Sequence, residues 1–247
     1  MSPARPRTVA VWRMLLATAH VVRGLWIIRT RFERQSPEQT EATVAQWSRD
    51  MLRIMGVQLE VRGQAPAAGP CLVVANHISW LDILVINAAQ PVRFVSKADV
   101  LRWPLLGRLV AGAGTLFIER ESRRDALRMV QHMAERLQAG DRVAVFPEGT
   151  TGDGRSLLPF HPNLLQAAIT ADAPVMPLAL RYVKAGSQER HDAPVFIGET
   201  TLVASIWATL RARELTAVVH YTELQTADGR DRRDWAQDLH SRLARAL

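Results

Sequence analysis

Cysteine, lysine and tyrosine are almost missing from this 247-residue sequence. The single cysteine, Cys71, excludes an intramolecular disulfide and a cysteine-based metal site. Only two of the 31 basic residues are lysines, Lys97 and Lys184, which makes them candidates for roles that the planar fork of arginine does not fill. No Gly-x-Ser-x-Gly segment is present, which argues against a serine acyl-enzyme. No repeat or low-complexity tract appears either, so the length predicts one large α/β domain with a full core.

The sequence carries an excess of positive charge. The formal net charge is +7, and the isoelectric point is near 10.8. Such a balance favours an anionic partner, either nucleic acid, a phospholipid surface or a phosphorylated cofactor. With only two tyrosines, no aromatic-rich sheet motif and no zinc pattern, we expect neither nucleic acid nor a metal. A basic, non-enzymatic domain that binds lipid or nucleic acid is kept as the alternative from a different functional class.

The N-terminal segment is apolar but interrupted. Its apolar run has about the length needed to cross a bilayer, yet Arg13, His20 and Arg23 fall within it. On a helix, which advances about 100° per residue, these three side chains form one polar stripe, while Trp12 and Trp26 lie within about 40° of each other on another side. Because Trp favours the membrane interface, we expect a helix that lies in that interface. A single spanning anchor and a soluble helix packed on the core are the alternatives.

A second helix is expected next. Ser36-Pro37-Glu38 provides a capping hydroxyl, a first-turn proline and an early acid, and Gly56 predicts the end of the helix. One face is apolar and is expected to pack on the first helix or on lipid. We therefore divide the chain into a pair of membrane-associated helices over residues 1–56 and an α/β domain over residues 57–247.

Strands and helices alternate beyond this point. The alternation predicts an α/β fold with a mixed, largely parallel sheet flanked by helices. Ligands in such folds collect at the carboxyl ends of the strands. The first strands are expected at residues 57–61, 72–75, 92–96, 115–118 and 142–146, and helices at 83–89, 101–110 and 123–138.

His77 and Asp82 are the first candidate catalytic residues. His77 follows an apolar strand, and a strand end holds a side chain both exposed and rigid. In a continuous helix the two residues would point about 140° apart, so we place His77 in a turn, Ser79 at the helix N-cap and Asp82 in the first helical turn. A histidine oriented by a carboxylate can take the proton of a hydroxyl that attacks a carbonyl, which indicates acyl transfer to an alcohol. The same spacing also arises by chance.

A second group follows the strand expected at residues 142–146. In Phe146-Pro147-Glu148-Gly149-Thr150, a proline and a glycine flank a glutamate, and this predicts a sharp turn that presents Glu148 and backbone N–H groups to a ligand. An ordinary strand-ending turn is the alternative. Arg120, at the end of another apolar strand, is a candidate anion contact.

The order of these blocks resembles that of the glycerolipid acyltransferases, typified by bacterial 1-acyl-sn-glycerol-3-phosphate acyltransferase. Asn-His-x4-Asp, Gly-x-x-Phe-Ile-x-Arg, Phe-Pro-Glu-Gly-Thr and Val-Met-Pro-Leu-Ala occur in that order over roughly residues 72–182. Their joint occurrence is far more specific than any one of them. The resemblance implies that His77 is the general base and Asp82 its partner. It implies substrate contacts at Lys97, Arg120, Glu148, Gly149 and Thr150.

The resemblance also implies the reaction. A fatty acyl group passes from acyl-CoA or acyl carrier protein to the free hydroxyl of a lysolipid, with no further cofactor. The expected acceptor is 1-acyl-sn-glycerol-3-phosphate, which gives phosphatidic acid in phospholipid biosynthesis. We expect the enzyme on the cytoplasmic face of the bacterial inner membrane, monotopic or held by one N-terminal anchor. A family member that acts as a hydrolase or transacylase on lysophospholipids is an alternative.

One position departs from the pattern. The lysophosphatidate enzymes of the family usually continue Phe-Pro-Glu-Gly-Thr with an arginine suited to phosphate, whereas this chain has Thr151 followed by Gly-Asp-Gly. Lys97, Arg120 and Arg155 are candidates to replace the missing contact. The Gly-Asp-Gly continuation resembles that of the lyso-ornithine lipid O-acyltransferases, so lyso-ornithine lipid is the alternative acceptor.

Overall fold

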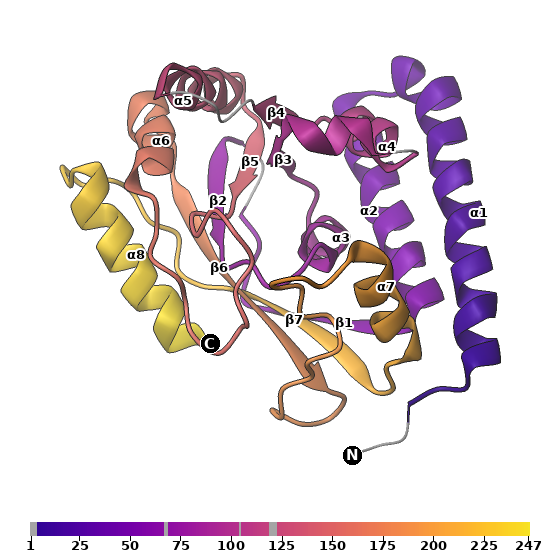
Figure 1. The fold of residues 1–247 in the computed structure, drawn as a ribbon. Helices are drawn as coiled ribbons and strands as arrows, with labels where there is room; N and C mark the ends of the chain where they lie inside the picture. Colours follow the sequence, from indigo (N-terminus) through magenta and orange to yellow (C-terminus); the bar gives the residue numbers. More distant parts are fainter. Residues whose placement is uncertain (1–3, 67–68, 104, 119–122) are drawn as a thin grey trace.

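A seven-stranded sheet in the order β1-β7-β6-β2-β5-β3-β4 lies at the centre of the protein (Figure 1). The computed structural model describes residues 4–66, 69–103, 105–118 and 123–247, with the backbone alone at Lys97, Ile118 and Arg123. Only β6 and β7 pair antiparallel, and the other neighbours are parallel. The predicted mixed, largely parallel sheet is therefore confirmed. Its strands are β1 Val57–Arg62, β2 Cys71–Ala75, β3 Arg93–Lys97, β4 Leu116–Ile118, β5 Arg142–Val145, β6 Val175–Lys184 and β7 Leu215–Tyr221.

Helices cover both faces of the sheet, and each face has its own buried core (Figure 1). Along β2, Cys71, Val73 and Ala75 point into one core, while Leu72 and Val74 point into the other. A strand buried on both faces is expected to be continuously apolar, as this one is. One face carries α1 Arg7–Arg31, α2 Pro37–Met55, α3 Leu81–Ala89, α4 Leu106–Gly112 and α7 Leu202–Arg211, and the other carries α5 Arg123–Gln138, α6 Gln166–Ala171 and α8 Arg232–Ala246.

The predicted helix over residues 101–110 is wrong in its continuity. A 3-10 helix, Ala98–Arg102, comes first, and α4 begins only at Leu106. The break has a local cause, because Leu105 adopts a left-handed backbone with φ of 63°, which no residue inside a right-handed helix can have. Two further 3-10 helices, Phe32–Arg34 and Pro162–Leu165, precede α2 and α6.

The start and end predicted for α2 are confirmed. The Ser36 hydroxyl accepts a hydrogen bond from the Gln39 N–H, and the Gln39 side chain accepts one from the Ser36 N–H. This reciprocal pair satisfies two of the free N–H groups at the helix start. Gly56 ends the helix in the left-handed region, with φ of 72°, where glycine carries no steric penalty.

Helix α1 turns Arg13 and His20 toward the protein, whereas Arg23, the third residue of the predicted stripe, is exposed. Arg13 donates to the Met55 carbonyl over 2.8 Å. The His20 ring stacks on Trp47 with 4.8 Å between ring centroids, and each of the two rings bonds the backbone carbonyl of the other residue. The opposite side of the helix is apolar and faces away from the protein, with Trp12 61% and Leu15 60% exposed, and with Val11, Val22 and Trp26 also exposed. A helix of a soluble protein has the reverse arrangement.

The N-terminal helices share the core of the sheet. Met51, Leu52 and Met55 of α2 belong to the same buried cluster as residues of β2 and β7. The division of the chain near residue 56 stays a prediction, since the two segments are packed on one another. By length and composition, the segment Arg7–Arg34 is the one part of the described chain that could cross a membrane.

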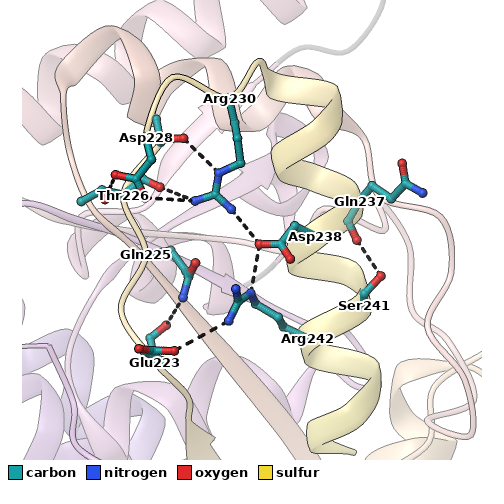
Figure 2. Close-up of polar contacts among 10 residues, drawn as sticks. Glu223, Gln225, Thr226, Asp228, Arg230, Gln237, Asp238, Ser241 and Arg242 are labelled. Carbon is teal, nitrogen blue, oxygen red and sulfur yellow. Dashed lines mark hydrogen bonds and ion pairs between the residues drawn. The ribbon is translucent and has the colours of Figure 1, made fainter.

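Charged residues before and within α8 form hydrogen bonds and ion pairs with one another, as Figure 2 shows. Arg230 and Arg242 both donate to one oxygen of Asp238, over 2.7 and 2.9 Å. The Arg230 guanidinium also lies 5.5 Å from the centre of the buried Trp235 ring. This network fixes α8 on the face of the sheet opposite to α1, away from the candidate site described next.

Candidate active site

The predicted site residues follow strands whose carboxyl ends share one edge of the sheet. β2, β5, β3 and β4 are mutually parallel neighbours. His77 follows β2 and Glu148 follows β5, while Lys97 is the last residue of β3. The topology thus gathers these residues at the edge where ligands of α/β sheets bind. The side chain of Lys97 and all of Arg120 lie outside the described residues, so their predicted substrate contacts stay predictions.

His77 and Asp82 lie in direct contact. The Nδ1 atom of His77 is 2.8 Å from Oδ2 of Asp82. Asp82 is completely buried, whereas the His77 side chain is 20% exposed. His77 lies in a turn and Asp82 lies in the first turn of α3, which is the arrangement predicted for bringing the two side chains together. A buried carboxylate bonded to Nδ1 fixes the ring and leaves Nε2 to accept a proton.

The start of α3 differs from the prediction in one respect. The N-cap residue is Trp80, not Ser79. The Ser79 hydroxyl accepts from the Leu81 N–H, and the N–H groups of Ile78 and Ser79 donate to Oδ2 of Asp82 over 2.7 and 2.9 Å. These two N–H groups orient the carboxylate and are therefore not free to bind a developing oxyanion.

Two aromatic rings line one side of His77. Phe146 stacks on the imidazole, with 3.9 Å between centroids and 8° between the ring planes. Phe94 lies 5.9 Å beyond Phe146. The stack limits rotation of the imidazole and places an apolar surface beside it. Sequence reasoning gave Phe146 no such contact, although the residue opens the second motif.

Glu148 is turned into the protein and does not point toward a ligand as predicted. It is 5% exposed. One carboxylate oxygen accepts from the His77 N–H and the other from the Leu158 N–H, both over 2.7 Å. Burial raises the pKa of Glu148 above its usual value, against the opposing effect of these two donors. The contacts support a positioning role, in which Glu148 ties the backbone of His77 to the loop after β5.

Replacement of Glu148 by glutamine is expected to loosen this loop. Glutamine offers one acceptor oxygen, so either the His77 or the Leu158 N–H would face an amide NH2 group. An unsatisfied buried donor costs about 1–3 kcal/mol, and we expect the free energy of unfolding to fall by about that amount, as measured by urea denaturation. Glu135→Gln, on the exposed side of α5, is the matched control. Equal stability of the two variants would contradict this role.

The remaining residues of the second motif shape the turn. Gly149 has φ of 72°, and a Cβ atom there would lie 3.0 Å from the His161 ring, so glycine is required on both counts. Thr150 is exposed. Thr151, where the family pattern predicts arginine, donates its hydroxyl hydrogen to the Phe196 carbonyl. Substrate binding by Gly149 and Thr150 stays a prediction.

Two other kinds of chemistry, a cysteine nucleophile and a metal site, find no support in the described residues. Burial raises the pKa of the Cys71 thiol to about 12, so this side chain is not a thiolate nucleophile near neutral pH. Within the described ranges, no group of three or more His, Cys, Asp or Glu side chains is arranged to hold a metal ion.

Comparison with known proteins agrees with these motifs. Residues 57–181 match the family model described as "Acyltransferase". A 1-acyl-sn-glycerol-3-phosphate acyltransferase of Neisseria meningitidis is 36% identical over 86% of this chain and 80% of its own length. A lyso-ornithine lipid O-acyltransferase of Pseudomonas aeruginosa is 37% identical over 81% of this chain and 76% of its own.

The fold is also that of a solved structure. The crystal structure of the 1-acyl-sn-glycerophosphate acyltransferase of Thermotoga maritima superimposes with a TM-score of 0.69 over 97% of this chain and 95% of that one, at 18% identity. At that identity the likeness concerns the fold alone. Together, the family match over half of the chain and the identity to the curated relatives show that this protein belongs to the acyltransferase family.

Proposed function

We propose that the protein transfers a fatty acyl group from a thioester to the free hydroxyl of a lysolipid. The observation that carries the proposal is the contact between His77 and Asp82, a partly exposed imidazole held at 2.8 Å by a completely buried carboxylate. The two curated relatives described above, which act on lysolipids by name, support the class of acceptor.

In the proposed mechanism, the transfer takes place in one displacement. Nε2 of His77 takes the hydroxyl proton as the acceptor oxygen attacks the thioester carbonyl. Asp82 stabilises the imidazolium that forms. Collapse of the tetrahedral intermediate breaks the carbon–sulfur bond, and His77 returns the proton to the departing thiolate. The donor is acyl-CoA or acyl carrier protein, and the high pKa of Cys71 supports transfer without an acyl-enzyme.

An apolar cavity beside the site supports an acyl ligand. It lies among α1, α2, α3 and α4, and Phe94 forms part of its wall. Phe94 in turn lies next to Phe146, which stacks on His77. The cavity's other apolar lining residues include Ile27, Val44, Trp47, Leu84 and Leu109. An acyl chain in this cavity would lie close to the reacting carbonyl, and its apolar surface would be removed from water.

Two acceptors fit the proposal. Lysophosphatidate stands first, because relatives of both bacterial and human origin act on it by name. Lyso-ornithine lipid is the second candidate, because Thr151 replaces the expected arginine and its hydroxyl is occupied by the Phe196 carbonyl. If lysophosphatidate is the acceptor, its phosphate group would then have to be bound by Lys97, Arg120 or Arg155.

The test is a head-to-head acylation assay. The purified protein is given lysophosphatidate or lyso-ornithine lipid, each with acyl-CoA and with acyl carrier protein as donor, and products are identified by mass spectrometry. The proposal expects acylation of at least one acceptor, with phosphatidate formed at the higher rate. A higher rate with lyso-ornithine lipid would reverse the order of acceptors. Absence of product from both would contradict the proposed function.

We further propose that α1 lies along the cytoplasmic face of the inner membrane with its apolar side in the lipid. This places the entrance to the cavity at the membrane surface, since α1 forms part of the cavity wall. Because Arg13 and His20 are already bonded to α2, neither has to enter the lipid with the outward side of α1, and the exposed Arg23 can extend to the lipid head groups. Helix α2 carries exposed Glu38 and Glu41 and half-buried Asp50 along its length, which argues against a pair that spans the bilayer.

Replacing Trp12, Leu15 and Trp26 together by glutamate is expected to release the protein from vesicles. Each of these exposed apolar side chains contributes roughly 1.5–3 kcal/mol when fully buried, so affinity for vesicles should fall at least about 100-fold in a sedimentation assay. Leu127→Glu, at a 70% exposed position on α5, is the control and should bind normally. Unchanged sedimentation of the triple variant would refute the interfacial helix.

A further inference from the structure

Both tyrosines of the chain are buried on neighbouring strands, but only one touches the candidate dyad. Tyr182 lies on β6 and Tyr221 on β7, with 2% and 3% exposure. The Tyr182 hydroxyl donates to Oδ1 of Asp82 over 2.6 Å. The Tyr221 hydroxyl has no hydrogen-bond partner among the described residues. The chain thus offers a tyrosine joined to the dyad and a matched tyrosine that is not.

Tyr182 completes the set of donors around Asp82. Oδ2 accepts from His77, Ile78 and Ser79, and Oδ1 accepts from Tyr182. A buried carboxylate is costly unless it is hydrogen-bonded on both oxygens. Because the fourth donor acts on the oxygen that faces away from His77, it also stops the carboxylate from rotating. Burial and the charge of Asp82 raise the pKa of Tyr182 well above its usual value, so the hydroxyl keeps its proton.

The strand that carries Tyr182 is tied to the residue before His77. β2 leaves the sheet after Ala75, and the Asn76 side chain takes over its pairing with β6. The amide of Asn76 donates to the Leu180 carbonyl over 3.0 Å and accepts from the Leu180 N–H over 2.7 Å. Tyr182 lies two residues further along β6, on the same face of the strand as Leu180. The position of the hydroxyl is therefore fixed relative to the turn that holds the imidazole.

We propose that Tyr182 is a positioning residue for acyl transfer, which holds Asp82 in the orientation that supports His77 as the base. The inference rests on the proposed function of the His77–Asp82 pair. Tyr182 touches neither substrate nor the imidazole. It acts through Asp82, and its loss should change the protonation behaviour of the site as well as the rate.

The other ionisable groups around this contact are few in the described structure. Glu148 faces the backbone of His77 from the loop after β5. Asp153, Arg181, Arg190 and His191 line a shallow pocket together with Tyr182. His191 is the one of these that commonly titrates near neutral pH, so the experiments include His191→Gln to separate its effect.

The first experiment compares Tyr182→Phe with Tyr221→Phe. For Tyr182→Phe we expect kcat to fall roughly 10- to 100-fold, because Asp82 can then rotate out of the orientation that supports His77, with KM nearly unchanged. A carboxylate that has lost a donor holds the imidazolium more strongly, so the acidic limb of the kcat/KM profile should move to higher pH. Tyr221→Phe should alter neither quantity. A Tyr182→Phe enzyme that loses thermal stability but keeps kcat and the pH profile would overturn the proposal.

A second measurement keeps the Tyr182 hydroxyl and does not depend on a folded Tyr182→Phe variant. The protein is labelled with 3-fluorotyrosine in the Tyr221→Phe background, which leaves Tyr182 as the one fluorinated residue. Its fluorine resonance should change with pH, and the change should be the same in His191→Gln. The titration should disappear in His77→Ala. A resonance that is flat with pH, or that still titrates without His77, would overturn the proposal.

The possible outcomes distinguish a failure of this inference from a failure of the proposed function on which it rests. An inactive His77→Ala together with a fully active Tyr182→Phe would refute only the role of Tyr182. A His77→Ala enzyme with normal turnover would refute the proposed function of the pair itself. Fluorine titration needs no acyl substrate, so it tests the contact whichever acceptor the enzyme uses.

Discussion

Alanine at position 77 is expected to lower the rate of acyl transfer by at least about 10³-fold, within the range attributed to a general base. His77 is the one imidazole among the described residues that is bonded to a buried carboxylate and stacked on an aromatic ring. Without it, the acceptor hydroxyl would have to attack while still protonated, or lose its proton to water. The measurement is the initial rate of product formation with a saturating thioester.

The fold should survive this substitution. The contacts that hold the turn use backbone atoms of residue 77, whose N–H donates to Glu148 and whose carbonyl accepts from Gly152. Circular dichroism and the urea midpoint should therefore stay close to those of the unsubstituted protein. His132→Ala, at an exposed position on α5, is the control and should keep full activity. Near-normal turnover by His77→Ala would rule out the mechanism.

Asparagine at position 82 is expected to lower the rate by roughly 10²- to 10⁴-fold, because the imidazolium would lose the negative charge that stabilises it. The structure explains why this variant should still fold. The asparagine oxygen can take the place of Oδ2 and keep the three donors there. Its NH2 group then faces the Tyr182 hydroxyl, which can accept as well as donate.

The comparison for Asp82→Asn is Asp50→Asn on α2. Asp50 is paired with Arg53 on the surface, so its loss removes a negative charge of the same size far from His77. The control should keep its turnover, and both variants should unfold at similar urea concentrations. If Asp82→Asn also kept its turnover, the charge of Asp82 would have no part in the reaction.

The His77–Asp82 pair was predictable because its geometry is local. The two residues are five apart, and a turn followed by a helix start is enough to join them. The carboxyl edge of the sheet was predictable for a similar reason, since apolar runs followed by polar motifs indicate strand ends. The same local logic located the start of α2 at Ser36 and its end at Gly56, because caps depend on neighbours within a few residues.

The contacts made by distant segments were not predictable. Glu148 was expected to face a ligand, but its partners include the N–H of His77, 71 residues earlier in the chain. Tyr182 lies 100 residues after Asp82, and only its place just after the last motif pointed to the site. The polar stripe of α1 was visible in the sequence, yet the inward orientation of Arg13 and His20 depends on acceptors of α2, such as the Met55 carbonyl.

The measurement that tests the central claim most directly uses two acceptors that differ by one oxygen. Thioester cleavage is followed with lysophosphatidate and with its analogue in which the free hydroxyl is replaced by hydrogen, while intact-protein mass spectrometry monitors covalent acylation. If lysophosphatidate is not a substrate, lyso-ornithine lipid and its deoxy analogue take its place. Direct transfer to the hydroxyl predicts cleavage with the hydroxyl acceptor, little cleavage with the analogue, and no acylated protein with either. Equal cleavage with both, or an acyl group attached to the protein, would contradict it.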